Sequence, residues 1–354
     1  MPTIFDYVNA REIGAYYTEK AENKMPYLGR TLFPRKKKIG LDLSWFKGAG
    51  GLPVTLTNAT FDADAPLRDR IGFGKIETEM PFFREAMRIG EKERQEILKL
   101  MSGNNVQLIM PYLNKIFDDI TGLVEGAEVN AERMRMQLVS TGLISIVSNG
   151  IAYDYDYNFD PNHKETLAVD ARWSQFATAD PVEDIRKAQQ KIEDDTGRRP
   201  TRAICTRKTW NYLVRNTKIL ADMDAKAYVK NTNAVVNDKL LKKYLLEELD
   251  LTVAVYNKKF ATSVKNQLAQ LFFPDDVFTL IPEGTLGNTW YGTTPEEADL
   301  LSGQVAAEVK IVDTGIAITT IKDPHPVNVQ TIVSGIDMPS FERIAEVYIL
   351  TVHS

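Results

Sequence analysis

The chain has 354 residues, of which 44% are hydrophobic, so it can bury a sizeable core, and its length allows two or three domains. Its 43 lysines and arginines stand against 48 aspartates and glutamates, a net charge of −5, which excludes a surface built as a whole to hold nucleic acid and leaves local contacts. The single cysteine, Cys205, excludes an internal disulfide and a multi-cysteine metal site, and is typical of a chain made in a reducing compartment such as the cytoplasm.

Residues 1–45 predict an extended arm. Pro26, Gly29, Pro34 and Gly40 break this segment into short amphipathic pieces, with no pattern long enough for a core of its own. The N-terminus has no apolar stretch of the kind a signal peptide needs, and no apolar run approaches the roughly 20 residues of a membrane span. We therefore expect neither a secretory signal nor a membrane anchor.

Residues 46–90 predict a long two-stranded excursion. A glycine-rich stretch follows Trp45, and two β-favouring segments, 54–61 and 71–80, are separated by a polar turn. Because a two-stranded ribbon is marginal alone, we expect it to lie on another surface, which in an oligomer can belong to a neighbouring copy.

Two helices are predicted next, a charged one over residues 85–101 and a long one over residues 111–142. At about 1.5 Å per residue the long helix measures roughly 45 Å, which suits a strut along a flattened subunit better than an element of a small globule. Its apolar residues recur at three- and four-residue steps and give it one apolar face. They are Ile116, Ile120, Leu123, Val124, Ala127, Ala131, Met134 and Leu138.

A β-hairpin follows the long helix. Segments 144–147 and 151–159 flank Asn149-Gly150, the dipeptide that most readily takes the positive φ angles of a tight turn. Over residues 181–301 the sequence predicts alternating helices and strands, as in a compact α/β domain. Its helix from Pro181 has Asp180 as cap and Gly197 as its end, and its strand 202–206 contains Cys205.

The rest of this domain is predicted to contain two helices and further strands. The tail then returns to β texture, so a domain inserted between two β-containing segments is the simplest topology. The predicted helices are 208–215 and 237–249, the strands 251–256 and one or two within 271–281, and the tail segments 305–321 and 343–352.

A calcium site is the most tempting chemical motif. The positions 1, 3, 5, 7 and 12 of an EF-hand loop are filled by Asp154, Asp156, Asn158, Asp160 and Glu165. Phe159 stands at the sixth position, where that loop needs glycine, and the alternation of aromatic and acidic residues is typical of a half-buried strand. We therefore predict a strand, no metal and no cofactor.

No catalytic motif is found. The three histidines, His163, His325 and His353, lie in unrelated contexts, and no P-loop or nucleophile elbow occurs. A weak alternative is a soluble metal-dependent enzyme with a site made of Asp154, Asp160 and His163, which would gain stability from a metal or substrate.

The chain resembles the lambda-type major capsid proteins of tailed bacteriophages, the major capsid protein E family, over nearly its whole length. Order and spacing of several segments carry the resemblance, since none is a signature alone. They are Pro26-Tyr27-Leu28-Gly29-Arg30-Thr31-Leu32-Phe33-Pro34, the glycine-broken excursion after Trp45, Ala131-Glu132-Arg133-Met134, Phe273-Pro274-Asp275-Asp276-Val277, Gly287-Asn288-Thr289-Trp290-Tyr291-Gly292 and Lys322-Asp323-Pro324.

The resemblance implies an α+β tailed-phage major capsid fold, in which an axial α/β domain is inserted into a peripheral domain with a long spine helix. The implied parts are an N-terminal arm (1–45), an extended β-hairpin loop (46–90), the peripheral domain (91–175), the axial domain (176–303) and a return to the peripheral sheet (304–354). The implied function is structural and not enzymatic. The chain would form the hexamers and pentamers of an icosahedral head that encloses double-stranded DNA and is encoded by a phage or a prophage.

The same resemblance implies partners and a place in the virion, after synthesis in the bacterial cytoplasm. A portal, a prohead protease and a decoration protein are implied, and a separate scaffolding protein is expected because arm-like sequence begins almost at once. DNA would be held without sequence specificity. A bacterial nanocompartment shell shares the fold and stays open as an alternative.

Two groups of residues are candidate contacts. The candidates for contacts between subunits are Trp45, Phe46, Phe61 and Arg68, since aromatics concentrate interface energy. The alternative for Trp45 and Phe46 is local packing. Arg30, Arg35, Lys36, Lys37 and Lys38 could face packaged DNA or an acidic neighbour, or be a solvated run of charge.

Overall fold

The computed structural model describes residues 9–21, 27–46, 75–102, 106–148, 151–226, 228, 236–262, 268–303, 307–325 and 327–353. The chain divides into two compact units, each built from three separate segments. We call one the sheet unit (Met1–Leu43, Glu77–Arg133 and Asn288–Ser340) and the other the α/β unit (Ser44–Ile76, Met134–Gly287 and Phe341–Ser354).

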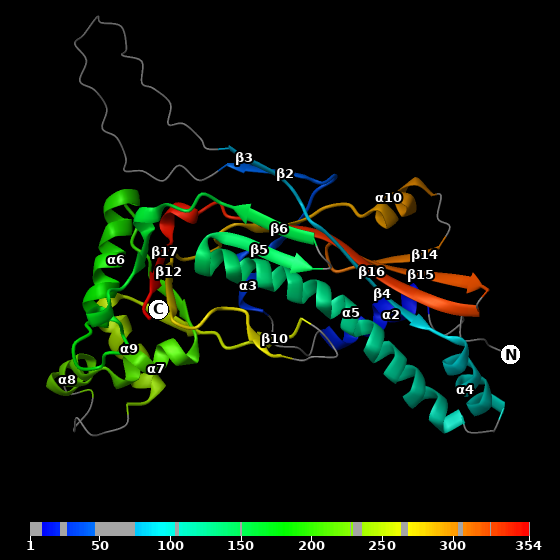
Figure 1. Ribbon diagram of the computed structural model, residues 1–354, viewed down its shortest axis with the longest axis horizontal. Helices are drawn as coiled ribbons and strands as arrows, with labels where there is room; N and C mark the ends of the chain where they lie inside the picture. The colour runs from blue at the N-terminus through cyan, green and yellow to red at the C-terminus, as the bar shows by residue number, and fades with distance from the viewer. Residues whose placement is uncertain are drawn as a thin grey trace, which may run out of the picture. The chain divides into compact units, whose positions relative to one another are not determined.

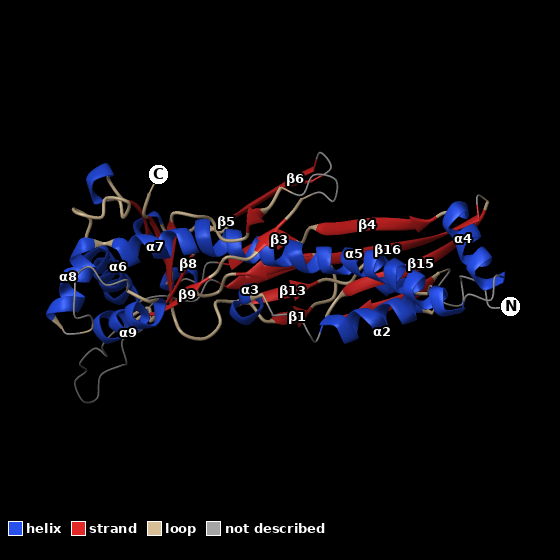
Figure 2. Ribbon diagram, turned by 90° about the horizontal axis from the view of Figure 1, so that it is seen from below, coloured by secondary structure: helices blue, strands red, loops and turns tan. Residues whose placement is uncertain are grey.

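The sheet unit is organised around one six-stranded sheet with the order β1-β13-β16-β15-β14, in which β4 also pairs with β16. The 14-residue strand β16 is the centre of this sheet, because it pairs with β13, β15 and β4, all antiparallel (Figure 2). The strands are β1 (Arg35–Lys37), β4 (Phe82–Ile89), β13 (Asn288–Tyr291), β14 (Glu308–Val312), β15 (Ile316–Pro324) and β16 (Val327–Ser340).

Helices α2 and α5 bury their apolar sides in the core of the sheet unit. Ile13 of α2 and Val124 of α5 are completely buried, and both belong to one cluster with Ile318 of β15. Figure 1 shows α2 beside β14 and β15. The helices of the unit are α2 (Ala10–Ala21), α3 (Leu28–Leu32), α4 (Glu91–Ser102), the first part of α5 (Val106–Thr141) and α10 (Pro295–Ser302).

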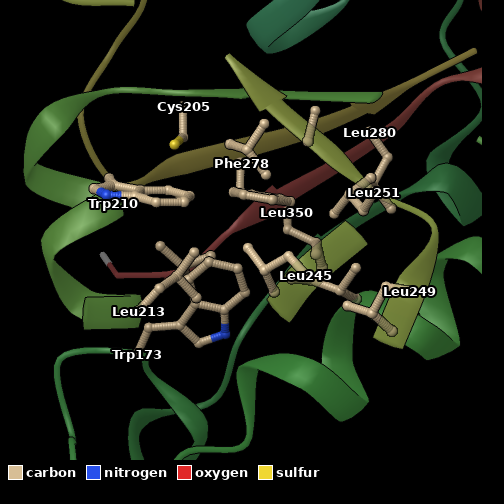
Figure 3. Close-up of a cluster of buried hydrophobic side chains, with 14 of the residues drawn as sticks. Trp173, Cys205, Trp210, Leu213, Leu245, Leu249, Leu251, Phe278, Leu280 and Leu350 are labelled. Atoms are coloured by element: carbon tan, nitrogen blue, oxygen red, sulfur yellow. The ribbon is translucent and has the colours of Figure 1, made fainter. Parts of the chain in front are cut away.

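The α/β unit is built on a five-stranded sheet with the order β7-β17-β12-β8-β9. Its core contains Trp173, which meets Phe278 edge-on at 5.2 Å between ring centroids, and Trp210, which is completely buried (Figure 3). The strands are β7 (Lys164–Thr166), β8 (Arg202–Cys205), β9 (Thr252–Val255), β12 (Val277–Ile281) and β17 (Tyr348–Thr351), and the helices are α6 (Pro181–Thr196), α7 (Arg207–Arg215), α8 (Thr217–Ala225) and α9 (Asp238–Leu249).

Three two-stranded sheets complete the described strands. One of them, β5 with β6, follows the end of α5 directly and is the predicted hairpin. The pairs are β2 (Asp42–Phe46) with β3 (Lys75–Glu79), β5 (Leu143–Ser148) with β6 (Ile151–Asp156), and β10 (Lys259–Phe260) with β11 (Gln270–Leu271), and three short 3-10 turns lie at Pro161–His163, Val169–Ala171 and Ile344–Glu346.

Several local predictions are confirmed. The long helix is present as α5, and the hairpin pairs Ile144 with Tyr155. Helix α6 begins as predicted, since the Asp180 side chain accepts a hydrogen bond from the Glu183 backbone N–H, and it ends at Gly197 in the left-handed conformation, with φ of 70°. These elements are specified by residues within or next to them.

Other expectations need correction. The charged helix predicted over residues 85–101 begins at Glu91, because the residues before it form β4 and pair with β16. The predicted return of residues 304–354 to one sheet ends at Ser340, since β17 pairs with β12 in the α/β unit. The described part of the predicted arm is not extended throughout: it forms α2 and α3, and its strand β1 pairs in parallel with β13.

Candidate subunit-contact surfaces

The basic segment around β1 divides into buried and exposed cations. Arg35 is buried, with only 7% of its side chain exposed, and it forms ion pairs with Glu128 of α5 and, at 2.9 Å, with Asp313 of the β14–β15 turn. Burial opposes the charge of Arg35, but Glu128, Tyr291 and Asp313 together outweigh burial, so the pKa of the guanidinium is raised. Arg35 therefore serves the inside of its own unit, and not a surface.

Lys37 is also engaged within the sheet unit. Its ammonium donates to the Gly292 carbonyl at 2.9 Å and pairs with Glu297 of α10. Arg30, Lys36 and Lys38 differ, because Arg30 and Lys36 are exposed and Lys38 is half-exposed, and the Lys36 ammonium lies over the Trp290 ring at 5.4 Å. Lys37 is an exposed residue as well, but its ammonium is engaged within the unit, so Arg30, Lys36 and Lys38 are the cations of the segment that we consider for a partner.

The backbone around β1 forms hydrogen bonds with both α5 and β13. The Gly29 N–H donates to Glu132 of α5 at 3.0 Å, and the Thr289 hydroxyl of β13 donates to the Phe33 carbonyl at 3.0 Å. The Tyr17 hydroxyl of α2 donates to Asp313 at 3.1 Å, so the carboxylate that binds Arg35 also binds α2. Burial, followed by the charge of Asp313, raises the pKa of Tyr17 and keeps it neutral.

The sequence contains a signal for part of this network. Glu128 and Glu132 lie one turn apart on the apolar side of the long helix and are 6% and 0% exposed. A carboxylate on an apolar helix face is costly unless it is paired. That pattern predicts buried cationic or N–H partners, although it cannot name Arg35 or Gly29.

The aromatic candidates for subunit contact have different outcomes. Trp45 is 6% exposed and its ring lies on Tyr157 at 5.2 Å between centroids, so the alternative of local packing describes it. Phe46 ends β2, but its side chain, like Phe61 and Arg68, lies outside the part of the chain that the structure describes. These three stay predictions.

Two residues of the weak enzyme alternative, Asp160 and His163, belong to one 3-10 turn, but their side chains bond different groups. His163 is buried, with its Nε2 2.8 Å from Asp195 of α6, whereas Asp154 lies exposed on β6 and Asp160 caps a 3-10 turn by accepting from the Asn162 N–H. Among the described residues, no group of three or more histidine, cysteine or acidic side chains could hold a metal ion. Cys205 is fully buried, and burial raises the pKa of its thiol.

No helix in the described segments is both long and apolar enough to cross a membrane.

The fold is found in several solved structures. A prophage protein from E. coli CFT073 that is described as a capsid protein aligns with a TM-score of 0.61 and 16% identity, over 98% of this chain and 99% of that chain. A phage-related protein from Bordetella bronchiseptica RB50 aligns with a TM-score of 0.56 and 13% identity, over 98% and 97% of the two chains. The capsid of cyanophage A-1(L) gives a TM-score of 0.50 and 10% identity, over 92% and 91%.

Sequence comparison agrees with the fold. No curated protein sequence matches the chain, but the family model for phage major capsid protein E matches residues 9–352. That match covers both units and every described element. The chain therefore belongs to the phage major capsid protein E family.

Proposed function

We propose that this chain assembles into the hexamers and pentamers of an icosahedral phage head that encloses double-stranded DNA. The family match over residues 9–352 carries the proposal. The family consists of structural capsid proteins, so the chain is a shell protein of the virion and not an enzyme. Its subunits associate with each other to form that shell.

The net charge of −5 favours a shell that assembles without being held together by DNA. A shell protein has to tolerate DNA at its inner face without collapsing onto it, and a slightly acidic chain makes few sequence-independent phosphate contacts. In this proposal DNA is enclosed after the shell has formed, through a portal, and a separate scaffolding protein, a protease and a decoration protein act around the shell. Synthesis takes place in the host cytoplasm.

Co-expression with the neighbouring phage genes, followed by electron microscopy and light scattering, tests the proposal. We expect closed shells with pentamers at the five-fold vertices and hexamers between them, and nuclease-resistant DNA in mature particles. Shells that enclose an enzyme cargo instead of DNA would assign the chain to a nanocompartment. A chain that stays monomeric with its scaffolding protein present would refute shell assembly.

A further inference from the structure

The exposed cations around β1 lie beside exposed apolar residues. Directly after Lys38, Ile39 is 87% exposed and Leu41 is 41% exposed. Two large apolar side chains exposed this close together would gain free energy if a partner covered them. We call Arg30, Lys36, Lys38, Ile39 and Leu41 the basic strip.

The β5–β6 hairpin presents a face of the opposite charge. Leu143 pairs with Asp156, and Ser145 pairs with Asp154, so the two carboxylates share the outer face with Leu143 and Val147. Asp154 and Asp156 are exposed, Leu143 is 43% exposed and Val147 is 68% exposed. We call Leu143, Val147, Asp154 and Asp156 the acidic strip.

The opposite face of the hairpin is covered. Ile144 and Ile146, which alternate with the exposed residues of β5, are 1% and 2% exposed. The hairpin therefore buries one apolar face without Leu143 and Val147, which lie on its other face and are not needed for that packing.

Both strips include a strand edge that is open to pairing. β1 ends the order of its sheet. On the hairpin the edge of β5 is already occupied, because the Gln137 side chain bonds the N–H and the C=O of Ser145 at 3.2 and 3.0 Å. The open edge of the hairpin is therefore that of β6, with which no further strand pairs among the described residues. Open edges of this kind pair readily with another chain. Each strip thus combines charge, apolar surface and unpaired backbone.

We propose that the acidic strip of one copy docks on the basic strip of the next copy in the shell. The occupant is a second copy of this chain, because one chain carries both complementary charges and both sets of apolar residues. Double-stranded DNA matches the cations but not Ile39 and Leu41, and it repels Asp154 and Asp156. This inference rests on the proposed function, since it names a surface through which shell subunits meet.

The contact is heterologous, because two different patches meet. Such contacts continue from copy to copy and close into rings when the rotation allows, whereas a self-complementary patch stops at a dimer. Solvent-exposed ion pairs are individually weak and screened by salt. The interface therefore gains strength from repetition around a ring, and high salt weakens it.

Charge reversal tests the pairing. The acidic-strip variant carries Asp154→Lys and Asp156→Lys, the basic-strip variant carries Lys36→Glu and Lys38→Glu, and the third variant carries all four changes. We expect each two-residue variant to raise the protein concentration needed for assembly about tenfold, which corresponds to about 1.4 kcal/mol per subunit contact. The four-residue variant should return to within about threefold of the parent, because its charges attract again in reversed order.

A mixture of the two single-strip variants gives a sharper readout. Neither variant attracts itself, but each attracts the other, so the mixture should form alternating rings. Alternation fits six subunits and frustrates five, and electron microscopy of the mixture should therefore show six-membered rings with few closed shells. A variant with Lys239→Glu and Lys243→Glu on α9 has the same change of net charge as the basic-strip variant and should assemble like the parent.

All changed side chains are exposed or half-exposed, so we expect every variant to fold. Circular dichroism and thermal unfolding of each variant check this. A four-residue variant that assembles no better than either two-residue variant would overturn the pairing. A basic-strip variant that assembles normally but loses DNA would place the strip against DNA instead. Failure of the parent chain itself, with its scaffolding protein present, would refute the proposed function and not the pairing alone.

Discussion

In the α/β unit, side chains next to each helix bond the free backbone N–H groups at its N-terminus. In the sheet unit, buried charged side chains join segments that are far apart in the sequence. In the α/β unit, Asp180, Thr206, Asn216 and Asn237 each cap the helix that follows them. In the sheet unit, Arg35 reaches helix α5 and the β14–β15 turn through carboxylates that are far away in sequence. The ends of these helices in the α/β unit are thus specified locally, whereas the position of β1 in the sheet unit depends on partners from distant segments.

The difference has an energetic consequence. A buried ion pair contributes little net stability over an apolar replacement, but it is costly to break, because one charge is then left without its partner. An apolar core loses stability in proportion to the volume removed. We therefore expect the sheet unit to be most sensitive to changes of charge and the α/β unit to changes of volume.

Replacing Arg35 is the most damaging change that we expect. Arg35→Met leaves Glu128, which is 6% exposed, without its cation and should cost about 3–5 kcal/mol of the sheet unit's stability. Hydrogen exchange followed by mass spectrometry should show faster exchange in β14, β15 and α2, with the α/β unit little changed.

Two variants control this experiment. Lys36→Met changes the adjacent, exposed cation and should leave exchange of the sheet unit nearly unchanged. Glu128→Gln in the Arg35→Met background removes the stranded charge and should recover part of the loss, so the two changes should not be additive. Equal effects of Arg35→Met and Lys36→Met would contradict a buried, paired Arg35.

A cavity is the corresponding test of the α/β unit. Leu213 is 0% exposed, so Leu213→Ala should cost about 2–5 kcal/mol, measured by urea unfolding. Leu246→Ala on α9 is the matched control, because Leu246 is 48% exposed and should cost no more than about 0.5 kcal/mol. Similar losses for both leucines would mean that α9 covers more apolar surface in solution than in the structure.

The same difference between the units explains which elements the sequence could predict. The cap at Asp180 and the stop at Gly197 act within the helix that they bound, and so α6 was predicted at its observed ends. β4 was missed in part because charged helix-forming residues run through it, and its strand state depends on pairing with β16. β16 itself was not predicted, since Gly335 and Pro339 interrupt its pattern.

The candidate surfaces followed the same rule. The sequence could identify a run of cations at Arg35–Lys38. It could not separate Arg35, whose partners come from two distant segments, from Lys36, which is exposed. The alternation that argued against a calcium loop did place Asp154 and Asp156 on the exposed face of β6. The sign of the charge on each surface was therefore predictable. Burial was predictable only where the alternation of side chains along a strand determines it.

Removing the helix cap of α6 should have a smaller effect. The Asp180 carboxylate accepts from the Glu183 N–H at 3.2 Å, so Asp180→Ala should lower stability of the α/β unit by about 1 kcal/mol. Asp180→Ser keeps a capping oxygen and should retain most of it. Hydrogen exchange in the first turn of α6 separates the two variants, and equal protection in both would exclude the cap as the cause.

The smallest effect should come from a carboxylate at the surface and should depend on pH. Asp238 binds Arg207 and accepts from the Trp210 indole N–H at 2.9 Å, and these bonds, that of Arg207 first, lower the pKa of Asp238. A pKa lower in the folded state means that the ionised form stabilises the fold, so this stabilisation is present at neutral pH and is lost as the pH falls through the folded pKa.

Asp238→Asn should therefore lower the free energy of unfolding at pH 7 by a few tenths to about 1 kcal/mol, since solvent screens the exposed ion pair. The difference from the parent should shrink as the pH falls below about 4, where the parent's carboxylate also becomes neutral. Urea unfolding followed by tryptophan fluorescence at pH 7 and at pH 3 measures both values, with Lys239→Gln as an exposed control on the same helix. A difference of equal size at both pH values would place the stabilisation in the packing of the side chain and not in its charge, and would contradict the prediction.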